Sequence, residues 1–79
     1  MMARIIDLEL YNLVGDNVRK YRIKMGLSQQ DLSERLEAYA IYICRGSICR
    51  IESYERTVTD FELKAFSEIL EVPIDKLFA

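Results

Sequence analysis

The residues best suited to recognise another molecule lie between positions 45 and 50. Arg45 and Arg50 carry permanent positive charges, and Gly46 and Ser47 add two small side chains between them. An arginine guanidinium presents its N–H donors in a rigid fork that matches the two acceptors on the edge of a guanine. A glycine leaves room for a neighbouring surface to approach closely. On the exposed face of one helix, these four residues would be able to read the base edges of DNA.

Other kinds of chemistry have few suitable residues in this chain. It contains no histidine, so the usual base for a serine or cysteine nucleophile is missing. Its two cysteines, Cys44 and Cys49, are too few for a zinc site and are poorly spaced for a disulfide. We interpret them as small residues of the core or of an interface, with a redox sensor as the alternative. We therefore expect no enzymatic activity, no catalytic residue, no metal and no cofactor.

Two short amphipathic helices are predicted to position the candidate residues. Ser28 is the expected N-cap of the first helix, and Asp31 takes the place of the usual glutamate in a capping box. Leu32 and Leu36 form the buried side of this helix, and Ser33 is small enough to let a second helix approach.

The second helix of the pair is predicted near residues 45–53. Ile48 and Ile51 are spaced for its inward face. Arg45 and Arg50 then lie on other faces of the helix, where water or DNA can reach them. The pattern therefore predicts a helix that is apolar on one side and basic on another.

Three further helices are expected to complete the core. The first runs over about 14–25 and ends at Gly26 in the left-handed conformation. The second begins at Thr59, which can form a capping box with Glu62. The last is a short helix over 74–78 that follows a proline.

Length and composition bound the organisation of the chain. Its 79 residues, 51% of them hydrophobic, suffice for one small folded domain, which we assign to residues 14–79. Residues 1–13 form an N-terminal arm. Ile6, Leu8 and Leu10 alternate with acidic residues in this arm, which suits a strand paired with its copy in a dimer. An unstructured or helical arm is the favoured interpretation.

The charge is small but unevenly distributed. The whole chain has a net charge of -2, which looks unfavourable for binding phosphates. Residues Gly15 to Val58, however, contain eight basic and six acidic residues, a net charge of +2. The remaining residues contain three basic and seven acidic ones, a net charge of -4. This polarity predicts a mildly basic half that meets DNA, with an ordinary unevenly charged surface as the alternative.

Three segments together resemble a known family. Residues 26–29 (GLSQ), 47–52 (SICRIE) and 70–78 (LEVPIDKLF) match, in order, parts of the phage repressor and Cro type of helix-turn-helix, the xenobiotic response element family of regulators. The resemblance runs from Val14 to Phe78, nearly the whole chain. It implies an all-α, five-helix, repressor-like DNA-binding domain whose recognition helix lies near residues 45–53 in the major groove.

The resemblance also implies roles for individual residues. The residues at the family's base-reading positions are Arg45, Gly46, Ser47 and Arg50. Gln29 at the start of the first helix of the motif is expected to donate to a DNA phosphate. Longer-range phosphate contacts are expected of Arg19, Lys20 and Arg56.

Two more roles concern the architecture that the resemblance implies. Arg22 and Glu52 occupy positions that form an ion pair between the first and third helices in phage repressors. Leu77 and Phe78 at the C-terminal end are the expected dimer surface, with the N-terminal arm as the alternative.

The chain departs from the family between the two helices of the motif. Residues 37–42 lengthen the turn by about five residues, and no glycine marks the reversal. Because Leu36, Tyr39 and Ile43 keep a helical spacing, we expect the first helix of the motif to gain about one turn before the chain reverses through residues 40–44. The protrusion contacts DNA or a partner on one interpretation, and lengthens the apolar core on the other. Cys44 also replaces the usual Ser or Thr cap.

The most consistent function is a sequence-specific transcriptional regulator, expected to be a repressor. Its partners would be double-stranded operator DNA and a second copy of the chain in a homodimer. No apolar run is long enough for a membrane span and no signal peptide is recognised, so we expect a cytoplasmic protein that does not bind membranes. The alternative function is a protein-interaction module, such as an antitoxin-like or anti-regulator domain on the same fold.

Overall fold

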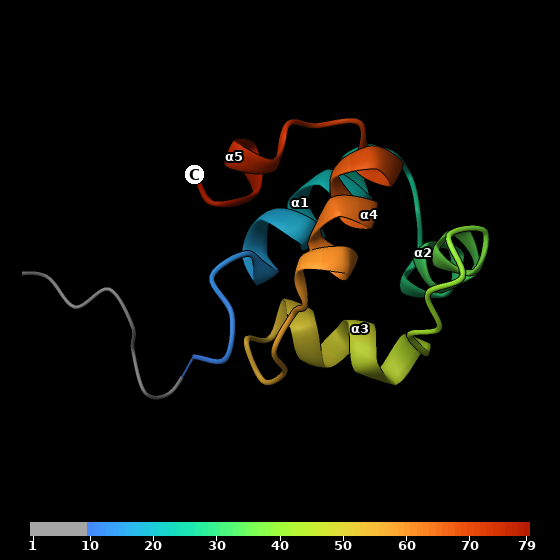
Figure 1. The fold of residues 1–79 in the computed structure, drawn as a ribbon, viewed down its shortest axis with the longest axis horizontal. Helices are drawn as coiled ribbons and strands as arrows, with labels where there is room; N and C mark the ends of the chain where they lie inside the picture. Colours follow the sequence, from blue (N-terminus) through green and yellow to red (C-terminus); the bar gives the residue numbers. More distant parts are fainter. Residues whose placement is uncertain (1–9) are drawn as a thin grey trace, which may run out of the picture.

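The computed structural model describes residues 10–79, which form five helices and no strand (Figure 1). The helices are α1 (Gly15–Lys24), α2 (Gln29–Glu37), α3 (Arg45–Glu52), α4 (Asp60–Leu70) and α5 (Ile74–Leu77). This confirms the predicted all-α class and a repressor-like arrangement of five helices with a long connection between α2 and α3. Of the predicted N-terminal arm over residues 1–13, residues 1–9 lie outside the described part of the chain, and residues 10–13 form neither helix nor strand.

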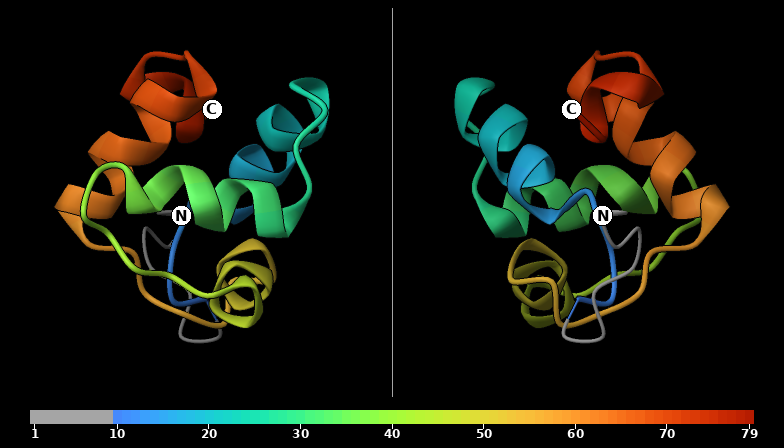
Figure 2. Two further views of the ribbon diagram at one scale, coloured as in Figure 1. Left: turned by 90° about the vertical axis from the view of Figure 1, so that its right-hand side faces the viewer. Right: turned by 90° about the vertical axis from the view of Figure 1, so that its left-hand side faces the viewer.

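The helices surround one apolar core. α3 lies at the opposite end of the molecule from α5, beneath α1, α2 and α4 in each view (Figures 1 and 2). Phe66 of α4 is fully buried, and α4 packs against both α1 and α2. The predicted inward residues of α2 and α3 are buried too: Leu32, Leu36, Ile48 and Ile51. Their burial leaves the opposite side of α3 facing solvent.

Capping boxes begin two of the helices, as predicted. The Ser28 hydroxyl accepts a hydrogen bond from the N–H of Asp31 at 2.9 Å, and the Asp31 carboxylate accepts one from the N–H of Ser28 at 2.9 Å. Thr59 and Glu62 make the same reciprocal pair at the start of α4, at 3.2 and 3.0 Å. Hydrogen bonds from the backbone and side chain of Ser28 lower the pKa of Asp31, so this cap is ionised at neutral pH.

Four of the helices end with a residue in the left-handed conformation. Gly26 takes φ 74° after α1, as predicted, and Ala40, Tyr54 and Glu71 take φ values of 58°, 65° and 58° after α2, α3 and α4. At each end the left-handed residue and its successor donate backbone hydrogen bonds to the last turn of the helix, a Schellman arrangement. Only the first of these positions holds glycine, for which this conformation carries no steric penalty.

The expected extra turn of α2 is wrong. α2 ends at Glu37, and the chain reverses through Ala40, whose N–H bonds to the carbonyl of Glu37 at 2.9 Å while the N–H of Ile41 bonds to that of Leu36 at 3.1 Å. The helical spacing of Leu36, Tyr39 and Ile43 predicted a longer helix, but Tyr39 lies on the surface and does not extend the buried side of α2. The early reversal lets Ile41 pack on the core and Ile43 enter it, which a continued helix would prevent.

None of the helices in residues 10–79 is long and apolar enough to cross a membrane.

Candidate nucleic-acid interface

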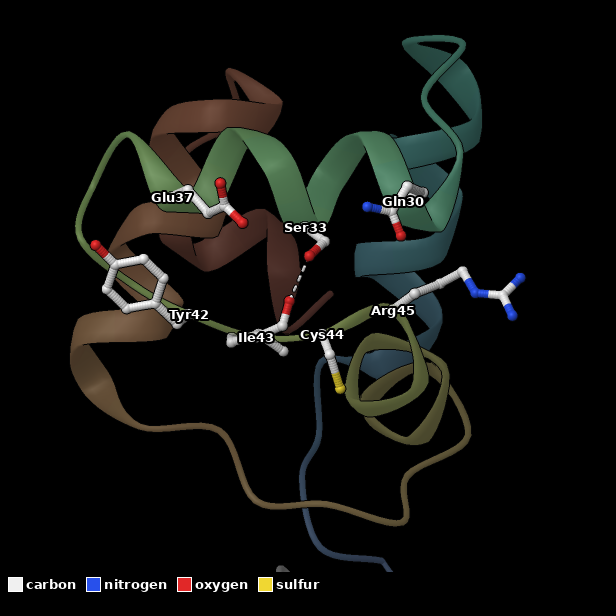
Figure 3. A pocket seen from close by; sticks show the side chains of 7 residues that line it. All are labelled: Gln30, Ser33, Glu37, Tyr42, Ile43, Cys44 and Arg45. Carbon is white, nitrogen blue, oxygen red and sulfur yellow. Dashed lines mark hydrogen bonds between the residues drawn. The ribbon is translucent and has the colours of Figure 1, made fainter.

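The outer face of α3 carries the predicted base-reading residues. Arg45, Gly46 and Arg50 are exposed and Ser47 is half-buried. The Arg45 side chain extends away from the turn that precedes α3 (Figure 3). Because the isoleucines of α3 are completely buried, both arginines can meet another molecule without disturbing the core.

The two cysteines also belong to this exposed region. Cys44 immediately precedes α3 and Cys49 lies within it, and both thiols are free and exposed. Our interpretation of them as core residues is wrong, because the buried side of α3 is taken by the isoleucines at positions 48 and 51. Cys44 makes no side-chain cap, and its thiol lies 3.5 Å from the Ser47 hydroxyl. Hydrogen bonds from the side chain and backbone of Ser47 lower the pKa of Cys44.

A buried ion pair ties α3 to the rest of the molecule. Arg22 donates from Nε and Nη2 to the two carboxylate oxygens of Glu52, at 2.7 and 3.1 Å. Its Nη1 donates to the carbonyl of Leu27 at 2.7 Å. The Arg22 and Glu52 side chains are only 10% and 3% exposed. The pair therefore joins α1 to the end of α3 at the positions named from the resemblance.

Gln29 extends the same network. Its Nε2 donates to Oε1 of Glu52 at 3.1 Å, so one hydrogen of its amide is already used inside the protein. A primary amide carries a second hydrogen, and Gln29 is half-buried rather than enclosed. Glu52 thus orients the side chain that was expected to meet a phosphate, a contact that the pattern of α2 alone did not indicate.

Arg56 has a structural partner that sequence reasoning missed. Its guanidinium makes a two-pronged ion pair with Glu62 at 3.0 and 3.1 Å. Partial burial raises the pKa of Glu62, but hydrogen bonds from Arg56 and Thr59 outweigh that effect and hold the pKa below its usual value. This ion pair links the segment after α3 to the start of α4, and the expected phosphate contact of Arg56 would have to compete with it.

The two remaining phosphate candidates lie side by side in sequence on α1. Arg19 and Lys20 are both exposed. The ammonium of Lys20 stands 5.1 Å from the centre of the Tyr21 ring, within reach of a cation–π contact. Both cations stay accessible to an anionic partner.

The C-terminal pair divides into a core residue and a surface residue. Leu77 is fully buried, so its assignment to a dimer surface is wrong: α5 uses it to pack on the domain's own core. Phe78 is 51% exposed. It lines an apolar groove together with residues from the start of the described chain, from the loop before α4 and from α4: Tyr11, Leu13, Val58 and Leu63.

Asn12 is an architectural residue that sequence reasoning missed. Its Oδ1 accepts hydrogen bonds from the N–H groups of Val14 and Gly15, and its Nδ2 donates to the carbonyls of Ile51 and Arg56. One side chain therefore bonds the backbone just before and at the start of α1 and holds it against the end of α3. Asn side chains readily bond backbone N–H groups two or three residues further on, and this tendency is the local signal for such a contact.

The turn between α2 and α3 borders an open groove beside α3. Residues of both helices and of the turn line it, among them Gln30, Glu37 and Tyr42 (Figure 3). Across its floor the Ser33 hydroxyl donates to the carbonyl of Ile43 at 2.6 Å. Tyr42 is 79% exposed, whereas Ile41 packs against the core, so the inserted segment contributes to both surface and core.

Comparison with known proteins matches the chain to one family model, described as helix-turn-helix, over residues 18–77. No curated protein and no solved structure matches it. Among residues 10–79, no three residues of the metal-binding types cluster as a metal site would require.

Proposed function

The chain belongs to the helix-turn-helix family of the Cro/C1 type, a DNA-binding family, and from this premise we propose that it is a sequence-specific transcriptional repressor. α3 would enter the major groove and α2 would lie across it. Arg45 and Arg50 would read guanines, while Gly46 and Ser47 would allow close approach and supply a further hydrogen bond.

The observation that carries this proposal is the division of α3 into two sides. Its apolar residues are fully buried, and its two arginines stand free on the other side without an acidic partner among the described ion pairs. An exposed arginine in water contributes little to folding. Two such residues on one short helix are therefore better explained by binding than by stability.

Phosphate contacts would fix the orientation of α3 on the duplex. The Ser28 cap leaves the start of α2 able to face an anion, and Gln29 keeps one amide hydrogen for it. Arg19 and Lys20 add exposed positive charge on α1. These contacts would supply affinity that does not depend on sequence.

A homodimer would give the protein operator-level specificity. One helix of eight residues reads only a few base pairs, whereas two copies on half-sites about one helical turn apart double the contacts. Exposed Phe78, with the apolar groove beside it, supports the C-terminal region as the contact surface. Sedimentation should detect a dimer, and Phe78→Asp should break it and weaken DNA binding together. A monomer both free and on palindromic DNA would contradict the dimer.

The function is tested with a short duplex selected from a randomised pool by the purified protein. Arg45→Ala and Arg50→Ala should each weaken binding to that duplex by about 1–3 kcal/mol and leave binding to random DNA nearly unchanged. Lys64→Ala is the matched control, because Lys64 lies on α4 and pairs with Glu68. Equal losses on selected and random DNA would make the two arginines phosphate contacts. Failure to select any sequence would contradict the function.

A second candidate function is a protein-interaction module on the same fold. It is favoured by the exposed Tyr39 and Tyr42 in the inserted turn and by the net charge of -2. DNA binding that falls steeply with ionic strength supports the first function. Lack of DNA retention at low salt, together with a stable complex with another protein that Tyr42→Ala disrupts, would support the second.

A further inference from the structure

The start of α3 is held differently from the starts of the other long helices. Side chains cap α2 and α4, and the side-chain oxygen of Asn12 accepts hydrogen bonds at the start of α1, but Cys44 gives α3 no side-chain cap. The preceding loop is also longer than a usual helix-turn-helix connection, and a longer loop leaves its ends more freedom. Something other than a cap must therefore determine where α3 begins.

Ser33 supplies that connection. It lies in the middle of α2 and is 6% exposed, and its hydroxyl donates to the carbonyl of Ile43 at 2.6 Å (Figure 3). Among the hydrogen bonds of residues 10–79, this is the one that joins the last three loop residues, 42–44, to α2. Ile43 is itself 3% exposed, so its carbonyl has little access to water that could replace the serine.

We propose that Ser33 is a positioning residue for DNA recognition, whose hydroxyl sets the place of Arg45. This rests on the proposed function. Arg45 follows the bonded carbonyl by two residues and opens α3, so a shift of the loop moves it directly. Arg50 lies more than a turn further along, between buried Ile48 and the ion pair of Glu52, and these contacts hold it independently of the loop.

Ser33→Ala removes the hydroxyl with almost no change in volume. Ser67→Ala is the matched control, because the Ser67 hydroxyl makes the same kind of bond from α4 to the carbonyl of Val72 in the following loop, at 2.5 Å. That loop leads to α5, at the opposite end of the molecule from α3 (Figure 1). Both variants lose one hydroxyl-to-carbonyl bond, but only the first loses it beside α3.

The experiment measures discrimination one base pair at a time, on the duplex selected by the wild-type protein and at a temperature where circular dichroism shows every variant folded. The base pairs read by Arg45 and Arg50 are those that Arg45→Ala and Arg50→Ala cease to discriminate. Ser33→Ala should lose roughly tenfold in discrimination at the Arg45 pair and keep it at the Arg50 pair. Ser67→Ala should keep both. If Ser33 contributed to stability alone, Ser33→Ala would not lower discrimination at one of these base pairs and keep it at the other.

Hydrogen exchange gives a second readout that needs no DNA. The backbone amide of Ile48, which donates to the carbonyl of Cys44 at 3.0 Å in the first turn of α3, should exchange faster in Ser33→Ala than in the wild type and should be unaffected in Ser67→Ala. Unchanged exchange, unchanged discrimination at both base pairs, or equal loss at both would overturn the role of Ser33. A wild-type protein that selects no sequence would instead overturn the proposed function, which separates the two failures.

Discussion

The two helices of the motif are anchored by different means. α2 begins with a complete capping box made from residues next to it in sequence, and both α2 and α3 end in a Schellman arrangement. α3 has no side-chain cap at its start and is held by bonds to distant residues: Glu52 pairs with Arg22, and the Ile51 carbonyl accepts a hydrogen bond from Asn12. The start of α2 is thus stabilised locally, while the position of α3 depends on residues from elsewhere in the fold.

This difference suits the proposed use of α3. A side-chain cap would occupy backbone N–H groups at the end that approaches DNA, whereas tertiary anchors act from the opposite face and leave the arginines free. It follows that variants of the distant anchors should harm α3 most, and that variants of local caps should have smaller effects.

The largest effect is expected from Arg22→Met. It leaves the carboxylate of Glu52 buried without its charged partner, which should lower the free energy of unfolding by about 3–5 kcal/mol. Urea denaturation measures this. The double variant Arg22→Met with Glu52→Leu should be milder, because it buries no unpaired charge. A fully stable Arg22→Met protein would mean that α3 does not depend on this anchor.

The next effect is expected from Gly15→Ala, at the contact between α1 and the end of α3. A Cβ at this position would lie 2.4 Å from the carbonyl oxygen of Ile51, so the two helices must move apart, at a cost of roughly 1–3 kcal/mol. Gly46→Ala is the control, because no atom lies within 4 Å of its added Cβ. That control should raise thermal stability slightly, by about 0.5–1 kcal/mol, through better helix propensity. Equal effects of Gly15→Ala and Gly46→Ala on stability would mean that the close approach of α1 to the end of α3 at Gly15 is not needed.

A smaller effect is expected from the caps. Ser28→Ala removes the capping box of α2 and should cost about 1 kcal/mol in thermal or urea unfolding. Cys44→Ser offers α3 a cap that it lacks and should raise the melting temperature, by less than Ser28→Ala lowers it. A Cys44→Ser protein that is more stable but binds the selected duplex less well would indicate that a cap at the start of α3, unlike the cap of α2, interferes with DNA binding. A lower melting temperature in Cys44→Ser would contradict the idea that α3 lacks a cap which serine can supply.

The smallest effect is expected at the end of α2, from Ala40→Gly. Relief of the left-handed conformation is worth about 1–2 kcal/mol, and the extra flexibility of glycine in the unfolded chain costs about 0.4–1 kcal/mol. A net gain of about 0.5–1 kcal/mol in urea unfolding is expected from that difference. Ala38→Gly is the control, because Ala38 has ordinary helical angles and should lose stability on the same change. A destabilised Ala40→Gly protein would show that the strain is absent.

Local signals account for most of what could be predicted. Both capping boxes involve residues three apart, and the left-handed Gly26 follows its helix directly, so their chemistry is visible in short stretches of sequence. The buried stripes of α2 and α3 follow the helical period for the same reason. The turn after α2 was mispredicted because its reversal depends on Ile41 and Ile43 reaching the core, which local spacing does not report.

The candidate site shows the same division. Its arginines and their exposure follow from the pattern of α3, and the family resemblance supplied their expected role. The partners of Gln29 and Arg56 did not follow, because the carboxylates that hold them come from other helices. Leu77 was misassigned for a related reason: an apolar residue near the C-terminus suits a core and an interface equally well until its neighbours in space are known.

By itself the sequence determined where helices begin, which sides of them are apolar and which short helix carries the arginines. These properties depend on residues within a turn or two of each other, where spacing alone decides which side chains meet. Tertiary structure alone decided which polar groups are shared between helices, from the Arg22–Glu52–Gln29 network to the bond from Ser33 to the loop before α3. Such bonds join residues 10 to 30 positions apart, and only the packing of the apolar core brings them within reach.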